Sequence, residues 1–198
     1  MLEQSSHPRS VRAKESVLCA TKELLDEGGL GAATVDAISA RSGVSKATIY
    51  KHWPCRTAIA AEAFGRRMAD AIPLPDEGTA IADLTEQVRR VSKFYAGPNG
   101  KIFAQLLAAS VTDEAAAPYF REFFLDTRRA NVAELWNRAL ARGEVNSAVS
   151  AGTATDLLFG PLIFRLMTGH APLAEQEAEA IATAALHGLL KANSAEDY

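Results

Sequence analysis

The chain has 198 residues, of which 48% are hydrophobic and 23% are charged, and its formal net charge at pH 7 is −3. This length and composition are typical of a globular protein with either one substantial core or a small domain joined to a larger one. No apolar run approaches the roughly 18 residues of a membrane span, and the first ten residues contain no hydrophobic signal region. We therefore expect a cytoplasmic protein that makes no membrane contact.

Cysteine and histidine are too sparse and too scattered for a metal centre. The two cysteines, Cys19 and Cys55, cannot form a disulfide framework, and no Cys or His pair has the spacing of zinc ligands. The sequence therefore predicts neither a metal nor a cofactor. Cys55 lies next to Arg56 at the expected start of a helix, a setting that favours a reactive thiol. Whether this thiol senses oxidants stays open.

Positive charge is concentrated near the N-terminus. Residues 1–56 hold 8 Lys or Arg against 6 Asp or Glu, whereas residues 57–198 hold 13 against 18. A basic segment without acids is expected of a surface that is held against phosphates. Residues 37–61 contain no acid and four basic side chains, which are Arg41, Lys46, Lys51 and Arg56.

Three helices are predicted in this basic part of the chain. Apolar residues recur at helical spacing over residues 10–27, and three closely spaced glycines then end the helix. A second helix begins at the N-cap residue Thr34 and ends at Gly43, and a third begins at the N-cap residue Ser45 and ends before Pro54. Two helices joined by a short turn with a glycine have the spacing of a DNA-reading helix-turn-helix.

The side chains of the third helix suit a nucleic-acid backbone. Short or planar hydrogen-bond donors alternate with basic residues along it. Such donors can bond phosphate oxygens, and the dipole at a helix start also favours anions. The donors are Ser45, Thr48, Tyr50 and His52.

The same stretch resembles a known family. Residues 43–53 follow the pattern G-V-S-x-x-T-x-Y-x-H-[FW], which looks like the signature of the TetR family of bacterial transcriptional regulators. Arg56 follows three positions after Trp53, at a place where lysine is commoner in the family. The resemblance implies that phosphates are bound by Thr34, Ser45, Tyr50, His52 and Arg56. It also implies that the major groove is faced by Lys46, Ala47, Thr48 and Tyr50.

Two of these residues have distinct chemistry for reading bases. Lys46 can donate to the O6 and N7 atoms of guanine, whereas Ala47 offers only apolar contact, for example to a thymine methyl group. Lys51 adds positive charge to the same surface. Asp36 departs from a purely basic surface, and we assign it no contact. The expected partner is double-stranded DNA.

The rest of the chain is predicted to be helical, because its apolar residues recur at three and four positions rather than at two. The predicted helices cover residues 57–71, 79–96, 100–111, 118–142, 153–168 and 174–193. We therefore predict an all-α fold of about nine helices, with a three-helix helix-turn-helix head and a larger helical-bundle body. Residues 1–56 are the predicted DNA-binding domain, and residues 57–198 are the predicted ligand-binding and dimerisation domain.

The last two predicted helices carry more apolar surface than an isolated helix pair can bury. Residues 156–167, DLLFGPLIFRLM, are apolar almost all round, and the final helix has a wide stripe of small and apolar residues. This favours a four-helix interface between two copies, and the pattern D-L-L-F-G-P-L-x-x-R-L is similar to a common C-terminal domain of TetR regulators. An ordinary core helix in a monomer is the alternative. The predicted interface residues are Leu158, Leu162, Arg165, Leu166, Ile181, Ala185 and Leu189.

The resemblance also implies a ligand cavity among the helices of the body. A cavity lined by aromatic side chains suits an apolar or planar small molecule, although an aromatic residue at helical spacing more often belongs to an ordinary core. The sequence does not identify the inducer. The predicted pocket residues are Phe103, Leu107, Phe120, Phe124, Trp136 and Phe164.

The sequence disfavours two other classes of protein. An enzyme needs convergent polar groups, and the chain has no HExxH, GxSxG or phosphate-loop glycine pattern. A helical protein-interaction adaptor without sequence-specific DNA binding would explain the apolar helices but not the basic segment without acids. We therefore predict a transcriptional regulator and not an enzyme. It is expected to be a repressor that binds an inverted repeat as a homodimer and is released by a small ligand.

Overall fold

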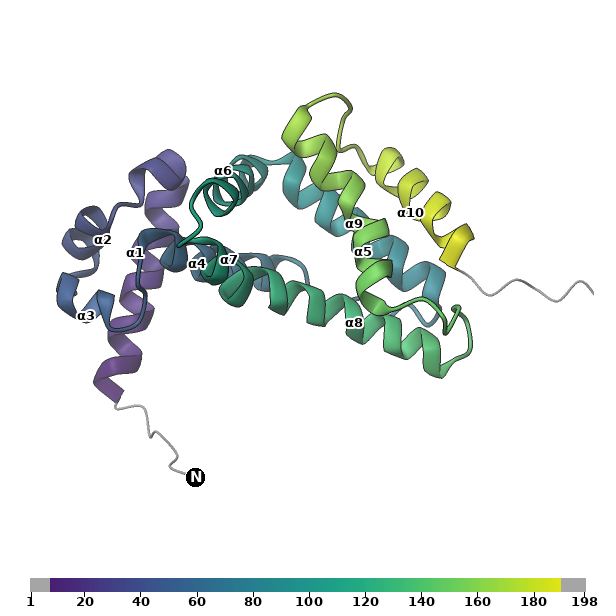
Figure 1. The fold of residues 1–198 in the computed structure, drawn as a ribbon, viewed down its shortest axis with the longest axis horizontal. Coiled ribbons are helices and arrows are strands. Elements are labelled where there is room, and N and C mark those ends of the chain that lie inside the picture. The colour runs from purple at the N-terminus through teal and green to yellow at the C-terminus, as the bar shows by residue number, and fades with distance from the viewer. Residues whose placement is uncertain (1–7, 190–198) are drawn as a thin grey trace, which may run out of the picture. The chain divides into compact units, whose positions relative to one another are not determined.

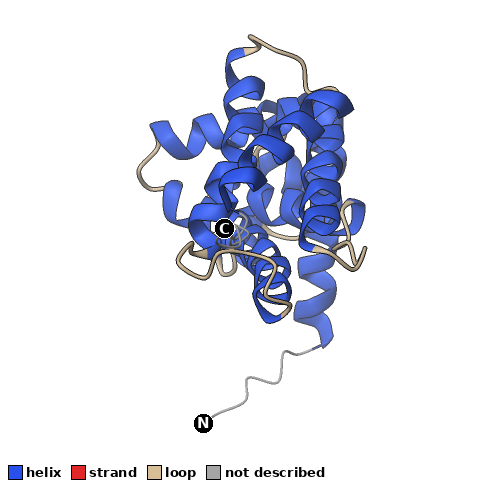
Figure 2. Cartoon of the chain, turned by 90° about the vertical axis from the view of Figure 1, so that its right-hand side faces the viewer, coloured by secondary structure: helices blue, strands red, loops and turns tan. Residues whose placement is uncertain are grey.

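The computed structural model describes residues 8–189, and it describes the side chains of residues 9–187. Every regular element in this part of the chain is helical, and no strand occurs there (Figure 1, Figure 2). The predicted all-α class is confirmed. The elements are α1 Pro8–Ala32, α2 Val35–Ser42, α3 Lys46–Tyr50, α4 Arg56–Ala71, α5 Ala80–Ala96, α6 Pro98–Thr112, α7 Ala117–Phe120, the π-helical turn η1 Arg121–Leu125, α8 Asp126–Ala141, α9 Ala151–Thr168 and α10 Glu175–Leu189.

The helix boundaries lie close to the predicted ones because capping residues mark them. Thr34, Thr79 and Ser150 are N-caps whose side chains accept a backbone N–H of the first turn. The segments α7, η1 and α8 follow one another without a break, as the single predicted helix over residues 118–142 requires. The described residues therefore contain nine separate helical runs. The part of the predicted last helix beyond Leu189 lies outside the described residues.

The first helix differs from its prediction at its C-terminal end. The glycines interrupt it as expected, since Gly28 and Gly29 have non-helical backbone angles and Gly29 has a φ of 65°. A further helical turn nevertheless follows and reaches Ala32. Only glycine adopts such a positive φ readily, so this position explains the break.

The chain divides into two compact units. The first contains the described residues up to Met68 together with Lys101–Asp126, and the second contains Ala69–Gly100 and the described residues from Thr127 onward. The functional boundary at residue 56 is a different kind of division and stays a prediction.

The core of the first unit is an aromatic cluster. Phe64 of α4 contacts Phe103 of α6 and Phe124 of η1, with ring centroids 6.2 and 5.7 Å apart, and the Phe103 and Phe124 rings are 5.4 Å apart. These three rings are at most 2% exposed. The α6 helix is also fixed to the end of α1, where the Leu30 amide donates to Gln105 Oε1 at 2.8 Å.

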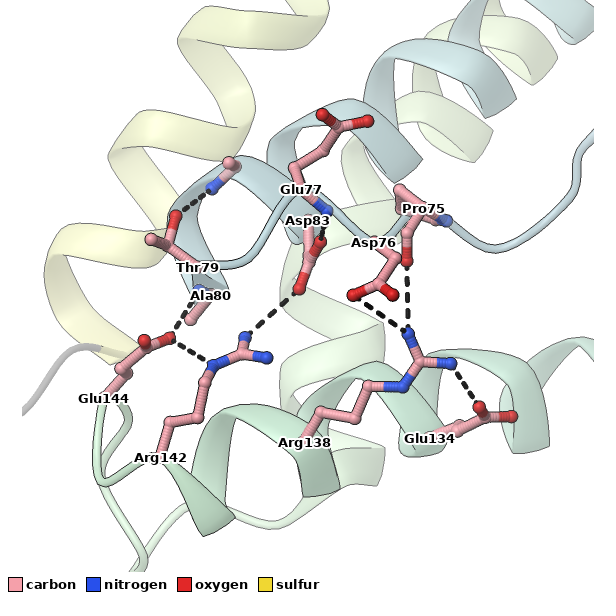
Figure 3. A network of polar contacts seen from close by, with 11 residues as sticks. Pro75, Asp76, Glu77, Thr79, Ala80, Asp83, Glu134, Arg138, Arg142 and Glu144 are labelled. Carbon is pink, nitrogen blue, oxygen red and sulfur yellow. Dashed lines mark hydrogen bonds and ion pairs between the residues drawn. The ribbon is translucent and has the colours of Figure 1, made fainter.

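The second unit is held by small residues and by long-range polar contacts. Helix α10 packs on α5 and α9, and it buries Ala178 and Ala182 completely, which allows close approach of the helices. At the start of α5 the buried Asp83 carboxylate accepts the Glu77 amide at 2.6 Å and pairs with Arg142 at 3.1 Å (Figure 3). The start of α5 is therefore fixed to the segment that follows the end of α8.

The described residues contain neither a membrane-spanning helix nor a metal-binding cluster. None of the helices between residues 8 and 189 is long and apolar enough to cross a membrane. The same part of the chain contains no group of three or more His, Cys, Asp or Glu side chains that could hold a metal ion.

Candidate DNA interface

The helix-turn-helix is defined by local hydrogen bonds. Thr34 Oγ1 accepts the Ala37 amide at 3.1 Å and starts α2, and Gly43 ends it with a φ of 70°. Ser45 Oγ accepts the Thr48 amide at 3.3 Å and starts α3. The predicted caps and the predicted turn glycine are therefore confirmed. These bonds aim the first residues of α3 away from the core.

The other face of the motif is fully packed. Ile38 of α2 and Ile49 of α3 are 0% exposed, and Trp53, which follows α3, is 1% exposed. The indole Nε1 of Trp53 donates to Glu62 Oε2 of α4 at 2.6 Å. This bond satisfies a buried donor and joins the end of the motif to α4. The orientation of α3 is therefore fixed from its buried side.

The solvent face of α3 carries most of the predicted DNA-contacting residues. Tyr50 is 53% exposed, which is unusual for an aromatic side chain in a packed domain. Exposed with it are Ser45, Lys46, Ala47, Lys51 and Arg56, while Thr34, Thr48 and His52 are half-buried. The structure therefore places eight of the nine predicted residues between the N-cap of α3 at Ser45 and the start of α4 at Arg56, whereas Thr34 lies at the N-cap of α2.

The charge of this face is not uniform. The Lys46 ammonium is paired with Asp36 of α2, and this hydrogen bond raises the pKa of Lys46 above its ordinary value. Both side chains are exposed, so the pair is accessible to a competing anion. Within the described residues Lys51 and Arg56 take part in no ion pair. The sequence predicted no contact for Asp36, because its partner Lys46 lies on the next helix.

Arg41 has a structural role. Its guanidinium donates to both carboxylate oxygens of Glu27 at 2.6 and 3.0 Å and lies 3.4 Å from Glu23. The hydrogen bond to Glu27 raises the pKa of Arg41 above its ordinary value. Both acids belong to α1, and the sequence alone did not show that they lie next to Arg41. Arg41 therefore fixes α2 to α1 and is not an unpaired cation on the basic surface.

His52 belongs to the same surface, and its environment changes its pKa. Burial lowers its pKa below the ordinary value, and the nearby Lys14 and Lys51 cations lower it further. Its Nε2 lies 3.5 Å from Ser10 Oγ, and its ring meets that of Trp53 edge-on at 5.7 Å. The imidazole is therefore neutral at neutral pH, and it can still donate one N–H to a phosphate oxygen.

Sequence comparison agrees with this geometry. Residues 17–63 match the family described as "Bacterial regulatory proteins, tetR family", and residues 74–185 match "Tetracyclin repressor-like, C-terminal domain". The regulator YdeS of Bacillus subtilis, an uncharacterised HTH-type protein, is 31% identical over 167 residues, which cover 84% of each chain. The chain belongs to the TetR family of DNA-binding transcriptional regulators.

Solved structures of TetR regulators share the whole fold. The crystal structure of the TetR family regulator SCO0332 matches with 32% identity and a TM-score of 0.82, and the match covers 89% of this chain and 97% of that one. The flavonoid-responsive regulator FrrA matches at 23% identity with a TM-score of 0.64, over 92% of this chain and 100% of that one. These relatives are regulators rather than enzymes.

The predicted pocket residues of this TetR regulator fall into two groups. Phe103, Phe120 and Phe124 are buried together in the aromatic cluster of the first unit, and the half-buried Leu107 lies on the same α6 helix. Trp136 is 0% exposed on α8 in the second unit. Phe164 of α9 belongs to neither group, since its side chain is 62% exposed and the other aromatic side chains of the predicted pocket are buried.

The predicted dimer residues also differ in exposure. Leu158 and Leu162 of α9 are buried within their own chain at 0 and 1% exposed. Arg165 pairs with Glu177 of α10 at 2.6 Å, while Leu166, Ile181 and Ala185 are half-buried. The side chain of Leu189 lies outside the described residues. The apolar side chains of α9 that are open to a partner are ones the interface prediction omitted: Leu157, Phe164 and Met167.

Proposed function

We propose that this TetR regulator is a homodimeric repressor that reads an inverted-repeat operator with α3 and leaves it when a small ligand binds. The observation that carries the proposal is the exposed surface around α3, where Tyr50, Lys51 at the C-cap and Arg56 at the start of α4 are exposed beside a helix whose other face is packed. An aromatic and basic surface on a rigid support suits recognition of a phosphate backbone and base edges.

The capping hydroxyls are placed to bind phosphates. Thr34 Oγ1 and Ser45 Oγ each accept a backbone N–H, so each hydroxyl can use its own hydrogen as a donor. They flank α2 and α3, the two helices that approach the backbone in this motif. Together with Lys51, Arg56 and the neutral His52, they form the positioning contacts of the proposed interface.

Base reading is assigned to the exposed start of α3. To bind DNA, the Lys46 ammonium must break its ion pair with Asp36 and bind a guanine edge or a phosphate instead. Because the ion pair is exposed to solvent, breaking it costs little free energy. Ala47 and Tyr50 are exposed on the same helix and offer apolar and aromatic contact. In this proposal Lys46 determines which base sequence is bound, while the capping hydroxyls and the remaining cations position the protein on the DNA backbone.

Selection of bound duplexes from random DNA, followed by a salt titration, tests this assignment. We expect an inverted repeat and a steep loss of affinity as salt rises, with a slope near −0.9 for each phosphate contact. Lys46→Ala is expected to weaken operator binding by roughly 5- to 100-fold and to relax the sequence preference. Lys101→Ala, which removes an exposed lysine from α6, is the matched control and should leave affinity unchanged. Equal losses from both variants would contradict base reading by Lys46.

The dimer is assigned to the open apolar face of α9. Leu157, Phe164 and Met167 follow one another at helical spacing and are 47, 62 and 44% exposed. Such a row on one helix indicates a surface that a second copy covers, since most soluble oligomers are symmetric homodimers. The buried Leu158 and Leu162 support α9 from beneath.

A charge placed on this face separates the dimer from a monomer. Phe164→Glu is expected to convert the dimer to a folded monomer and to abolish operator binding, because one α3 contacts only half of the site. Val111→Glu is the matched control, since Val111 is also apolar and is 75% exposed on α6. Light scattering on both variants measures the assembly. A wild-type monomer, or a dimer that survives Phe164→Glu, would contradict the interface.

Release by a ligand is the third part of the proposal. FrrA, which shares the fold, is named as a flavonoid-responsive regulator, so a small-molecule response occurs on this architecture. A ligand that prefers the conformation unsuited to the operator lowers DNA affinity by that preference alone, typically about 1 to 3 kcal/mol. Solution scattering with and without a ligand tests this part, because identical curves would contradict it.

A further inference from the structure

One arginine of the second unit lacks the partner that every other arginine there has. Six of the seven arginines of this unit pair with a carboxylate, for example Arg129 with Asp156 at 2.6 Å and Arg142 with Asp83 at 3.1 Å. Arg128 of α8 makes no ion pair with the described residues, and its Nε is buried without a hydrogen bond. The Arg128 side chain is half-buried, and a guanidinium that is partly removed from water without a counterion is unfavourable unless an anion binds it.

Two further buried polar atoms lack partners in the same unit. Gln87 of α5 is 5% exposed and its Oε1 accepts no hydrogen bond, while Trp136 of α8 is 0% exposed and its indole Nε1 donates none. An unpaired acceptor and an unpaired donor, both cut off from solvent, are uncommon in a folded protein. A group that accepts from the indole and donates to the amide oxygen, such as a hydroxyl, satisfies both.

These three groups belong to two rows of residues, one on α5 and one on α8, which are called the facing rows below. The Asp83–Arg142 contact shows that α5 begins where α8 ends, so the helices run in opposite directions (Figure 3). Moving inward from that contact, Gln87 on α5 and Trp136 on α8 come first. Farther along lie Tyr95 and Arg128, which interact electrostatically.

Each row has the same layout. Gln87, Val91 and Tyr95 are spaced by four residues on α5, and Arg128, Val132 and Trp136 have the same spacing on α8, so each trio lies on one helix face. The two valines are buried in the middle of their rows. The eight residues between the polar ends of a row correspond to about 12 Å along a helix.

The two helices are close together at the end where α5 begins and α8 ends, and they diverge toward their other ends (Figure 1). The Arg128 end of the rows is therefore the wide end, and the Gln87 and Trp136 end is the narrow one. Burial lowers the pKa of Arg128 and raises that of the Tyr95 hydroxyl, so at neutral pH this end offers a cation and a protonated hydroxyl.

We propose that the facing rows of α5 and α8 bind an elongated organic carboxylate that carries a hydroxyl group at its far end. The carboxylate accepts from the Arg128 guanidinium at the wide end, and the apolar middle of the ligand contacts Val91 and Val132. The far hydroxyl accepts from Trp136 Nε1 and donates to Gln87 Oε1. A span of roughly 8 to 12 Å between the two polar ends fits the rows. This proposal rests on the proposed ligand response and names the chemical class of that ligand.

Calorimetric titration of the full-length protein with 3-(4-hydroxyphenyl)propionate tests the proposal, with the methyl ester of this acid as the uncharged control. Wild type is expected to bind the acid at least about tenfold more tightly than the ester, because charge-assisted hydrogen bonds to a guanidinium are strong. The shorter 4-hydroxybenzoate is expected to bind more weakly than the longer acid, since it cannot reach both ends of the rows.

Two neighbouring substitutions show whether Arg128 is the anchor. Arg128→Met is expected to weaken binding of the acid by roughly 10- to 100-fold. It is also expected to raise the midpoint of thermal unfolding without ligand by about 1 to 4 °C, because it removes a buried charge without a partner. Arg129→Met removes the adjacent, carboxylate-paired arginine and should leave binding of the acid unchanged.

Each other outcome overturns the assignment. Equal binding of acid and ester, or binding that survives Arg128→Met, would show that the ligand is not held as an anion. If wild type binds neither probe acid, the rows hold water and no carboxylate of this class. Operator affinity without a probe is measured in parallel and should be equal in wild type and Arg128→Met. Loss of operator binding by wild type would contradict the regulator function, whereas loss of probe binding alone contradicts only the ligand class.

Discussion

The helix-turn-helix and the second unit differ in how far apart along the chain their hydrogen-bond partners lie. In the motif, Thr34 bonds the amide three residues later, Ser45 does the same, and Ser39 Oγ donates to the Val44 carbonyl at 2.8 Å. In the second unit, Asp83 pairs with a residue 59 positions away, and the Ala80 amide donates to Glu144 at 2.5 Å. The motif is encoded locally and leaves one face open, whereas the second unit exists only when distant segments meet.

Substitution of the two tryptophans by phenylalanine should give the largest contrast between these regions. Both are at most 1% exposed, but Trp53 donates to Glu62 at 2.6 Å while the Trp136 indole has no acceptor. Trp53→Phe is expected to lower the free energy of unfolding by about 1 to 3 kcal/mol, because it removes a buried hydrogen bond and leaves a void. Trp136→Phe should lower it by less, since no hydrogen bond is lost. Urea denaturation measures both, and equal losses would show that the Glu62 bond adds nothing.

Loss of a helix cap should lower the stability of both regions by the same amount, but only in the helix-turn-helix should it also weaken DNA binding. Thr34 caps α2 and Ser150 caps α9, where its Oγ accepts the Thr153 amide at 3.0 Å. Replacing either by alanine is expected to cost about 1 kcal/mol of unfolding free energy. Only Thr34→Ala should also weaken operator binding, because only Thr34 lies at the proposed phosphate contact. An equal loss of affinity from Ser150→Ala would mean that stability, and not contact, sets DNA binding.

Removal of Asp36 should strengthen the electrostatic attraction between the surface around α3 and DNA. Asp36→Ala releases Lys46 from its exposed ion pair, so we expect affinity for non-specific DNA to rise by up to about fivefold at low salt. The gain should vanish as salt rises, because salt screens exposed charges. Glu114→Ala, which removes an exposed carboxylate of the first unit, is the control for net charge. A gain of the same size in this control would assign the effect to net charge alone.

The smallest expected effect is a pH dependence through His52. Burial and two nearby lysines lower its pKa in the folded protein, so the unfolded chain binds the proton more readily. Its contribution to stability should therefore be complete above the ordinary histidine pKa near 6.5 and should fall as pH drops toward the lowered value. Urea titrations between pH 5.5 and 7.5 measure this slope, and His52→Gln should flatten it. An unchanged slope in that variant would assign the pH dependence to other groups.

Sequence interpretation succeeded where the signal was short-ranged. The caps Thr34 and Ser45 and the turn at Gly43 were identified correctly because each depends on residues within one helical turn. The roles of Arg41 and Asp36 were missed, because their partners Glu27 and Lys46 belong to other helices. A search for acids on the neighbouring helices would have found both pairs.

The residues assigned to the pocket and the dimer show the limit of periodicity. Helical spacing identifies which residues share a face, but it does not say which face meets the core. Leu158 and Phe164 are both apolar residues of α9, yet one is 0% and the other 62% exposed. Only the packing of α9 within its unit separates them.

The sequence by itself determined the all-helical class, the helix boundaries, the family and the basic α3 surface. These depend on periodicity, capping and local charge, which act over a few residues. The tertiary structure decided which charges are paired, which apolar faces stay open, and that buried polar atoms of Gln87, Trp136 and Arg128 lack a hydrogen-bond partner. Pairing and burial arise from contacts between distant segments, and those contacts exist only once the chain has folded.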